Sequence, residues 1–341
     1  MRKLALGLLA LLAVAACGGA AAPPSAGGAP LEKTAVKMGV GGQSQFIYLP
    51  LTLADQLGYF KAEGITVEII DLKGGSQALT ALLGGSVDVV TGFYEHTIRT
   101  QVQGKKIEMF ALFDLYPGLV LMVGKKHLDQ VRSIKDLVGK PVGVTSPGSS
   151  TDEMVKYLLK QAGLDPKAIP VVGIGSGSQA IAAIQSDQVW AGVTVDPAAS
   201  QLEKAGTAKA LYDTRTASGT KDVFGGTWPA GGFYTTADFI KQYPNTTQAL
   251  ARVAVKVLKY IKGHSAEDIA AHMPSDYLAA DRALYISSLK ANLPMFSPDG
   301  LMPADGPANV LKTLQLVDAT ITPDKVDLKQ TYDNGFVQKA R

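Results

Sequence analysis

The sequence has one cysteine, Cys17, and four histidines among its 341 residues. A lone cysteine cannot close a disulfide within the chain, and no CxxC pair or cysteine–histidine cluster offers a structural metal site. No HExxH spacing is present, which disfavours zinc hydrolase chemistry. We therefore expect neither a metal nor a cofactor.

An excess of charge of one sign is also missing. The chain carries 33 basic and 30 acidic residues, and its two lysine pairs, Lys105-Lys106 and Lys125-Lys126, are isolated. Nucleic-acid-binding proteins usually concentrate basic residues on one face. We therefore expect no nucleic-acid partner and interpret both pairs as solvated surface.

Beyond the N-terminus, no apolar run is long enough to span a membrane. The N-terminal run from Leu4 to Val14 is itself shorter than the roughly 20 residues that a membrane-spanning helix needs. It follows Arg2 and Lys3 and precedes small residues, which is typical of an export signal. Val14-Ala15-Ala16-Cys17 resembles the bacterial lipobox, which implies removal of residues 1–16 and lipid attachment at Cys17. An ordinary secretory signal with an incidental cysteine is the alternative.

The remainder of the chain is rich in residues that build a core. After a Gly-, Ala-, Pro- and Ser-rich start, which predicts a flexible tether over residues 17–35, the length exceeds that of most single cores and predicts two lobes. Short apolar runs alternate with helical patterns from Val36 to Val90 and again from Pro141 to Val195, as βα units do. The spacing of Leu49, Leu53, Leu57 and Phe60 predicts one helix from Leu49 to Phe60. From Phe239 onward the pattern is mostly helical. The fold class is therefore α/β.

Four segments appear in an order that resembles a known family. They are Tyr48 to Glu68 with its Gly58-Tyr59-Phe60, Gly74 to Val90, Leu137 to Thr151, and Ala182 to Pro197. The resemblance is to the periplasmic substrate-binding proteins of ABC transporters that handle nitrate, alkanesulfonates, taurine and thiamine-pyrimidine precursors. It covers residues 36–197 well and the C-terminal third only weakly.

This resemblance implies a two-lobed periplasmic-binding-protein fold of type II character, with the ligand cleft between the lobes. The chain would cross between lobes near Leu121 to Lys125 and near Pro229 to Phe233. Lobe 1 would comprise residues 36–122 and 230–341, and lobe 2 residues 123–229. The expected protein is a monomer outside the cytoplasm, in the periplasm or at the cell surface. It would be held to a membrane by its lipid and would deliver a small molecule to an ABC permease of the inner membrane.

Loops at strand ends supply the candidate binding residues. Ligands of open α/β sheets bind outside the carboxyl ends of the strands, where Gly41 to Ser44, Gly74 to Ser76 and Ser146 to Thr151 are expected. Glycine lets a ligand approach the backbone, and a helix N-terminus binds anions through its free N–H groups. We expect Gly148 to Thr151 to be the best anion site, with simple helix capping as the alternative.

Aromatic side chains near these loops favour an organic acid or a heterocycle over a bare inorganic ion. Glu95 follows them at the start of a predicted helix. It either accepts hydrogen bonds from an NH-bearing ligand or complements the helix dipole. Asp196 is expected to reach the ligand from the second lobe. The predicted ligand-binding residues are Gln43, Ser44, Tyr48, Gly75, Ser76, Phe93, Tyr94, Ser146, Gly148, Ser149, Ser150, Thr151, Asp196 and Trp228.

Enzymatic alternatives have weaker support in the sequence. Ser149, His96 and Asp196 could be drawn as a triad, but the GxSxG elbow is missing. By resemblance, exported dehydratases share this scaffold and would use a carboxylate such as Glu95 as acid or base. A ligand-sensing receptor is a third possibility. We expect a binding protein and not an enzyme.

Overall fold

The structure is a computed structural model and describes residues 29–341. The predicted signal peptide, the lipidation site Cys17 and most of the predicted tether lie outside the described residues. Between residues 29 and 341, no helix combines the length and the apolar character needed to cross a membrane.

One five-stranded sheet forms the centre of the first lobe. In spatial order its strands are β2 (Thr66–Asp71), β1 (Ala35–Val40), β3 (Val89–Phe93), β10 (Gly231–Thr236) and β4 (Ile107–Leu112). β1 pairs in parallel with β2 and β3, whereas β10 runs antiparallel to β3 and β4.

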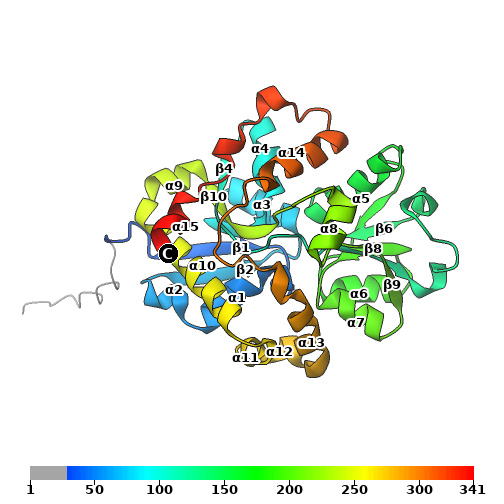
Figure 1. Ribbon diagram of the computed structural model, residues 1–341, viewed down its shortest axis with the longest axis horizontal. Coiled ribbons are helices and arrows are strands. Elements are labelled where there is room, and N and C mark those ends of the chain that lie inside the picture. Colours follow the sequence, from blue (N-terminus) through cyan, green and yellow to red (C-terminus); the bar gives the residue numbers. More distant parts are fainter. Residues whose placement is uncertain (1–28) are drawn as a thin grey trace, which may run out of the picture.

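A second five-stranded sheet repeats this arrangement in the other lobe, drawn in green in Figure 1. Its strands, in the corresponding order, are β7 (Val171–Gly173), β6 (Val142–Val144), β8 (Ala191–Thr194), β5 (Val120–Gly124) and β9 (Ala208–Asp213). β10 and β5 hold the same place in their sheets, next to last in this order, and each runs antiparallel to both of its neighbours. Each is also the first strand that the chain forms after it arrives from the other lobe.

Helices connect the strands within each lobe. They are α1 (Leu49–Gln56), α2 (Tyr59–Ala62), α3 (Gly75–Leu83) and α4 (Glu95–Val102) in the first lobe, and α5 (Ser150–Gln161), α6 (Ser178–Gln185), α7 (Ala198–Lys204) and α8 (Ala217–Phe224) in the second. Single 3-10 turns occur at Phe46–Tyr48, Lys125–His127, Ile134–Leu137, Leu293–Met295, Pro323–Lys325 and Leu328–Gln330.

The C-terminal third is helical, as expected. Its helices are α9 (Ala237–Gln242), α10 (Pro244–Gly263), α11 (Ala266–Ala271), α12 (Ser275–Leu278), α13 (Arg282–Asn292), α14 (Gly306–Val317) and α15 (Gly335–Ala340). α10 packs against α1 and α15 of the first lobe, whereas α14 contacts α5 and α13 contacts α7 of the second (Figure 1). The C-terminal segment therefore bridges the lobes.

The passages between the sheets lie earlier in the chain than the sequence predicted. The whole of β5, Val120–Gly124, belongs to the second sheet, so the chain crosses over residues 113–119 and not at Leu121 to Lys125. It returns over residues 225–230, just before β10. An apolar run such as Val120 to Val123 marks a buried strand but does not indicate which sheet receives it.

Two further predictions need local corrections. The helix expected from Leu49 to Phe60 is broken into α1 and α2, because Gly58 adopts a left-handed φ of 69° between them. From residue 30 onward, the predicted tether contacts the folded protein. The backbone N–H groups of Asn245 and Thr246 at the start of α10 donate to the carboxylate of Glu32, at 3.0 Å each.

Candidate functional site

The cavity of interest lies where strand ends from both sheets face each other. From the first lobe, the segments after β1 and β2 and the last residue of β3 reach it. The crossing residue Leu119 and, from the second lobe, the segment between β6 and α5 complete it. Its lining residues are Gly41, Gln45, Ile47, Tyr48, Gly75, Phe93, Leu119, Thr145, Ser149, Ser150 and Thr151. Parallel strands place their carboxyl ends at one edge, which is where ligands bind in such sheets.

The lobes are closed around this cavity. Its volume is about 10 Å³, close to the minimum that accommodates one water molecule. Ser76 and Ser146 hydrogen bond across the gap at 2.6 Å, and the Phe46 N–H donates to the Asp196 carbonyl at 2.9 Å. An organic molecule can therefore enter only when the lobes move apart or the lining side chains shift.

Six of the predicted binding residues line this cavity, and the others lie elsewhere. The six are Tyr48, Gly75, Phe93, Ser149, Ser150 and Thr151. Gln43 and Ser44 line a separate interlobe groove of about 470 Å³. Ser76 and Ser146 form the bridge between the lobes described above. Whether any of these residues binds a ligand stays a prediction.

Four predicted residues are engaged by other parts of the protein. The Tyr94 hydroxyl hydrogen bonds to Thr331 at 2.6 Å, and the Trp228 indole donates to Thr313 at 3.0 Å. Asp196 accepts from the Asn292 side chain at 2.6 Å. The Gly148 N–H donates to the Asp152 carboxylate at 2.7 Å.

Hydroxyl groups dominate the second-lobe side of the cavity. Thr145, Ser149 and Thr151 hydrogen bond to one another at 2.7 to 3.0 Å, and all three are buried. At the start of α5, the Gly148 N–H is directed to the Asp152 carboxylate. The helix terminus expected to receive an anion therefore already has a carboxylate of the protein beside it.

Two buried ionisable residues lie behind the first-lobe side, against the lining residues Ser150 and Gly75. Glu95 and His96, the first residues of α4, are 0% and 1% exposed. The Ser150 hydroxyl donates to Glu95 Oε1 across the gap at 2.7 Å, and His96 Nδ1 hydrogen bonds to the Tyr234 hydroxyl at 2.9 Å. Within the described range, Glu95 Oε2 and His96 Nε2 have no hydrogen-bond partner.

Burial sets the protonation of this pair. It raises the pKa of Glu95, an effect that Arg99 and the Ser150 hydrogen bond offset only in part. Burial and the positive charge of Arg99 lower the pKa of His96 to about 3, so the imidazole is neutral near pH 7. The 3.4 Å contact between His96 Nε2 and Glu95 Oε1 is therefore not an ion pair.

A second buried carboxylate, Asp114, follows β4 at the crossing. Its side chain is 0% exposed, and neither carboxylate oxygen finds a hydrogen-bond partner among residues 29–341. Burial raises the pKa of Asp114 well above its usual value, and the nearby Gly231 backbone opposes this shift only partly. Burial, followed by the charges of Asp114 and Glu95, also raises the pKa of the Tyr48 hydroxyl, which lines the cavity.

Sequence reasoning missed several residues of the site. Gln45, Ile47, Leu119 and Thr145 line the cavity, and Asp114 lies close to it. Thr145 directly follows the apolar run of β6, so its place at a strand end was a usable signal. Asp114 had no such signal, because it lies in the first crossing, which was predicted to occur later in the chain.

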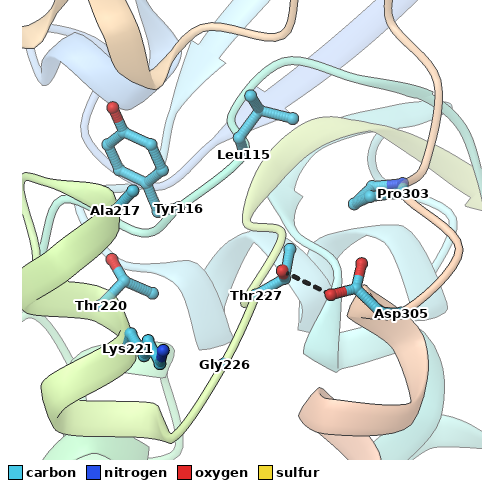
Figure 2. Close-up of a pocket in the computed structure, with 9 residues that line it drawn as sticks. All are labelled: Leu115, Tyr116, Ala217, Thr220, Lys221, Gly226, Thr227, Pro303 and Asp305. Atoms are coloured by element: carbon cyan, nitrogen blue, oxygen red, sulfur yellow. Dashed lines mark hydrogen bonds between the residues drawn. The ribbon is translucent and has the colours of Figure 1, made fainter.

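A larger hollow of about 570 Å³ lies beside the two crossings, and Figure 2 shows its lining. Leu115 and Tyr116 come from the first crossing, and Gly226 and Thr227 from the second. The Thr227 hydroxyl donates to Asp305 at 2.7 Å. None of the predicted binding residues lines this hollow.

Comparisons with known proteins identify the family. A family model described as NMT1-like matches residues 29–274. A solved structure from Bordetella bronchiseptica RB50 is 40% identical, covers 92% of this chain and 98% of its own, and superposes with a TM-score of 0.89. YtlA of Bacillus subtilis strain 168, named as a binding protein, is 24% identical over 282 residues, 80% of each chain.

A further solved structure has the same fold at lower identity. It is the alkanesulfonate-binding protein SsuA from Xanthomonas axonopodis pv. citri bound to MOPS, which is 20% identical, covers 89% of this chain and 99% of its own, and has a TM-score of 0.68. The resemblance stated from the sequence and the predicted two-lobed α/β fold are both confirmed. The chain belongs to the NMT1-like family and has the fold of periplasmic substrate-binding proteins.

Proposed function

We propose that this protein is the exported, lipid-anchored substrate-binding component of an ABC importer. It captures a small organic ligand between its lobes and presents the closed form to a permease. The observation that carries the proposal is a cavity lined by aromatic, aliphatic and hydroxyl side chains between two lobes, which are joined by two short crossings and a C-terminal helical segment.

Contacts across the gap support reversible closure. Ser76–Ser146 and Ser150–Glu95 each pair a group of one lobe with a group of the other, and each group is a side chain that water could solvate after opening. Such contacts differ between the open and the closed form. A ligand that binds the closed form more tightly shifts the population toward it. Hinge closure around a ligand is the movement that this class of fold provides.

Export and anchoring rest on the N-terminal sequence. The apolar run from Leu4 to Val14 and the lipobox-like segment ending at Cys17 support secretion and lipid attachment. An importer needs its binding protein on the outer side of the permease. Attachment through Cys17 would keep the folded lobes beside the membrane.

A ligand screen tests the capture function. The mature chain is heated in the presence of aromatic carboxylates, sulfonates, amines, amidines, aminoheterocycles, nitrate and taurine. A true ligand at 100 times its Kd is expected to add about 2.7 kcal/mol to the free energy of unfolding. Small-angle X-ray scattering of the same sample should show a smaller radius of gyration. The absence of any stabilising compound would remove the capture proposal.

Two controls separate binding from alternatives. Substitution of Ser149 and Ser150 by leucine places bulk in the cavity wall and should abolish ligand-induced stabilisation while the unliganded chain remains folded. Unchanged stabilisation would remove this loop from the site. Recovery of the ligand chemically unaltered after prolonged incubation separates a binding protein from a dehydratase-like enzyme.

A further inference from the structure

Arg99 of the first lobe contacts the second lobe across the gap. It lies on α4, and its guanidinium donates to the Gly148 carbonyl at 2.9 Å and lies 3.2 Å from the Glu153 carboxylate. Gly148 directly precedes α5 and Glu153 lies on it, so both belong to the second lobe. The ion pair is largely buried, with side-chain exposures of 23% and 8%. When the lobes move apart, Arg99 therefore loses both partners at once.

Glu95, four residues before Arg99 on α4, also depends on the second lobe. Its Oε1 accepts from the Ser150 hydroxyl at 2.7 Å, whereas its Oε2 has no hydrogen-bond partner among residues 29–341. Residues four apart lie on the same face of a helix, and an acidic residue that precedes a basic one by four positions is in the favourable order for an ion pair. Withdrawal of the second lobe would thus leave a carboxylate and a guanidinium side by side, both without their partners.

The protonation of Glu95 favours this pair in the open form. Burial raises the pKa of Glu95 in the closed form, and Arg99 offsets the rise only in part. A carboxyl group that becomes solvated on opening returns toward its ordinary pKa of about 4.3 and is ionised at neutral pH. The charged or titratable groups around Glu95 are His96 and Arg99 on α4, Glu153 and Lys156 on α5, Tyr48 before α1 and Tyr234 on β10.

Given the hinge closure of the proposed function, on which the exchange depends, we propose that Arg99 pairs with Glu153 when the lobes are closed and with Glu95 when they are open. A buried charge without a partner is strongly destabilising, so the exchange lowers the free energy needed for opening. Lys156, 2.9 Å from Asp152 and 3.4 Å from Glu153, stays with the second lobe and neutralises the carboxylates that Arg99 leaves.

The exchange makes Arg99 a positioning residue for capture. Arg99 does not line the interlobe cavity, so it acts on a ligand only through the equilibrium between the two forms. A ligand that binds the closed form is weakened in proportion to the fraction of molecules that are open. Each form has one carboxylate for the same guanidinium, which keeps the two forms close in free energy.

A ligand-free measurement of opening tests the exchange. Spin labels are attached to Lys61→Cys on α2 and Ala182→Cys on α6, two exposed positions in opposite lobes, in the mature chain with Cys17→Ser. The label distances give the ratio of open to closed molecules. A rare open form is detected by alkylation of Ser146→Cys, because Ser146 is only 4% exposed when closed. A rare closed form is detected by disulfide formation between Ser146→Cys and Ser76→Cys, since these hydroxyls lie 2.6 Å apart there.

Two isosteric variants should shift this ratio in opposite directions. Glu95→Gln removes the partner of the open form, while the glutamine still accepts from Ser150, so the open-to-closed ratio should fall about twofold or more. Glu153→Gln removes the partner of the closed form and should raise the ratio about tenfold, as expected for a hydrogen bond to a charged group. The control Glu108→Gln changes a half-buried carboxylate on β4 and should leave the ratio unchanged.

Arg99→Gln distinguishes the exchange from a simpler effect of burial. Glu95→Gln also removes the free energy of burying a carboxylate, and that contribution remains when residue 99 is glutamine. The ratio should therefore respond about twofold more strongly to Glu95→Gln when Arg99 is present. Arg99→Lys, which keeps the charge, should retain most of this difference. An equal or weaker response in the presence of Arg99 would show that the two residues do not pair in the open form, and the exchange would be wrong.

Two other results bear on the hinge. If Glu153→Gln favours the closed form, the Arg99 pair does not hold the lobes together, and the exchange is again wrong while capture stands. A single label distance in every variant, without alkylation of Ser146→Cys, would mean that the lobes do not open. That outcome would remove hinge closure from the proposed function together with the exchange. Circular dichroism confirms that the variants are folded.

Discussion

The two walls of the interlobe cavity differ in chemistry although the two sheets have the same strand order. The first lobe contributes the aromatic rings Tyr48 and Phe93, and the ionisable pair Glu95 and His96 lies behind its lining residues. The second lobe contributes mainly the hydroxyl cluster of Thr145, Ser149 and Thr151. The same architecture thus provides a first-lobe wall that can discriminate between ligands and a second-lobe wall that can adapt to them.

This difference follows from what each side chain can do. Rings and buried carboxylates have fixed shapes and large desolvation energies, so a wrong ligand leaves a strong interaction unmet. Hydroxyl groups both donate and accept, and they rotate to suit a partner. We infer that specificity resides in the first lobe and that the second lobe completes the enclosure.

The largest expected effect is a pH dependence located in the first-lobe wall. Unfolded histidine titrates near pH 6.5, whereas the pKa of buried His96 is about 3, so the folded chain resists protonation. Stability contributed by neutral His96 is complete above pH 6.5 and is lost as the pH falls toward 3. The loss should be about 1.4 kcal/mol per pH unit across this window.

Chemical denaturation of wild type and His96→Gln at pH 4, 5, 6 and 7 measures this slope. The raised pKa values of Glu95 and Asp114 act in the opposite direction, because their protonated forms fit the folded state better as the pH falls. Only the difference between the two proteins therefore reports His96. A difference that does not change with pH would show that His96 is not kept neutral by its surroundings.

The second effect concerns closure and compares one glycine from each lobe. A Cβ on Gly74 would lie 2.1 Å from the end of the flexible Gln77 side chain, which can move away, and 2.5 Å from Ser146 Oγ in the other lobe. A Cβ on Gly143 would lie 2.4 Å from Ile174 within its own lobe. Gly74→Val should prevent full closure and weaken ligand binding about 100-fold, or about 2.7 kcal/mol. Gly143→Val should instead reduce the free energy of unfolding by about 1–3 kcal/mol through overpacking.

Small-angle X-ray scattering and calorimetry on both variants test whether Gly74 limits closure and Gly143 limits stability. Gly74→Val should melt like the wild type but show no ligand-dependent decrease in the radius of gyration. Gly143→Val should melt earlier and still close when ligand is added. If Gly74→Val closes normally, the Gly74–Ser146 approach is not part of the closing contact.

Much of this fold could be predicted because its signals are local. The alternation of apolar strands and helices in residues 36–90 and 141–195 depends on neighbouring positions, and both blocks form the sheets expected. The break at Gly58 was harder to predict, since the helical spacing of Leu53, Leu57 and Phe60 continues across a backbone that turns left-handed. Periodicity reports which face is buried and not whether the helix is continuous.

The site was predictable only as far as strand ends locate it. Phe93 is the last residue of β3, and Tyr48 directly precedes α1. Ser149 to Thr151 form the start of α5, and all of these residues line the cavity. Trp228 and Tyr94 also lie near strand ends, but their polar atoms bond to Thr313 and Thr331 in the C-terminal third. Those partners lie 85 and 237 residues further along the chain. No local pattern announces such contacts.

The smallest expected effect separates two adjacent serines. Ser150 donates to Glu95 in the other lobe, whereas the Ser149 hydroxyl contacts Thr145 and Thr151 in its own lobe. Ser150→Ala should favour the open form by about 1 kcal/mol, the usual net value of one hydrogen bond, and should leave unfolding unchanged. Ser149→Ala should reduce the free energy of unfolding by a similar amount and leave closure unchanged.

Distances between spin labels, one in each lobe, report the open fraction. If both variants shift it equally, the two serines do not divide between closure and lobe stability, and the hydroxyl wall acts as one unit.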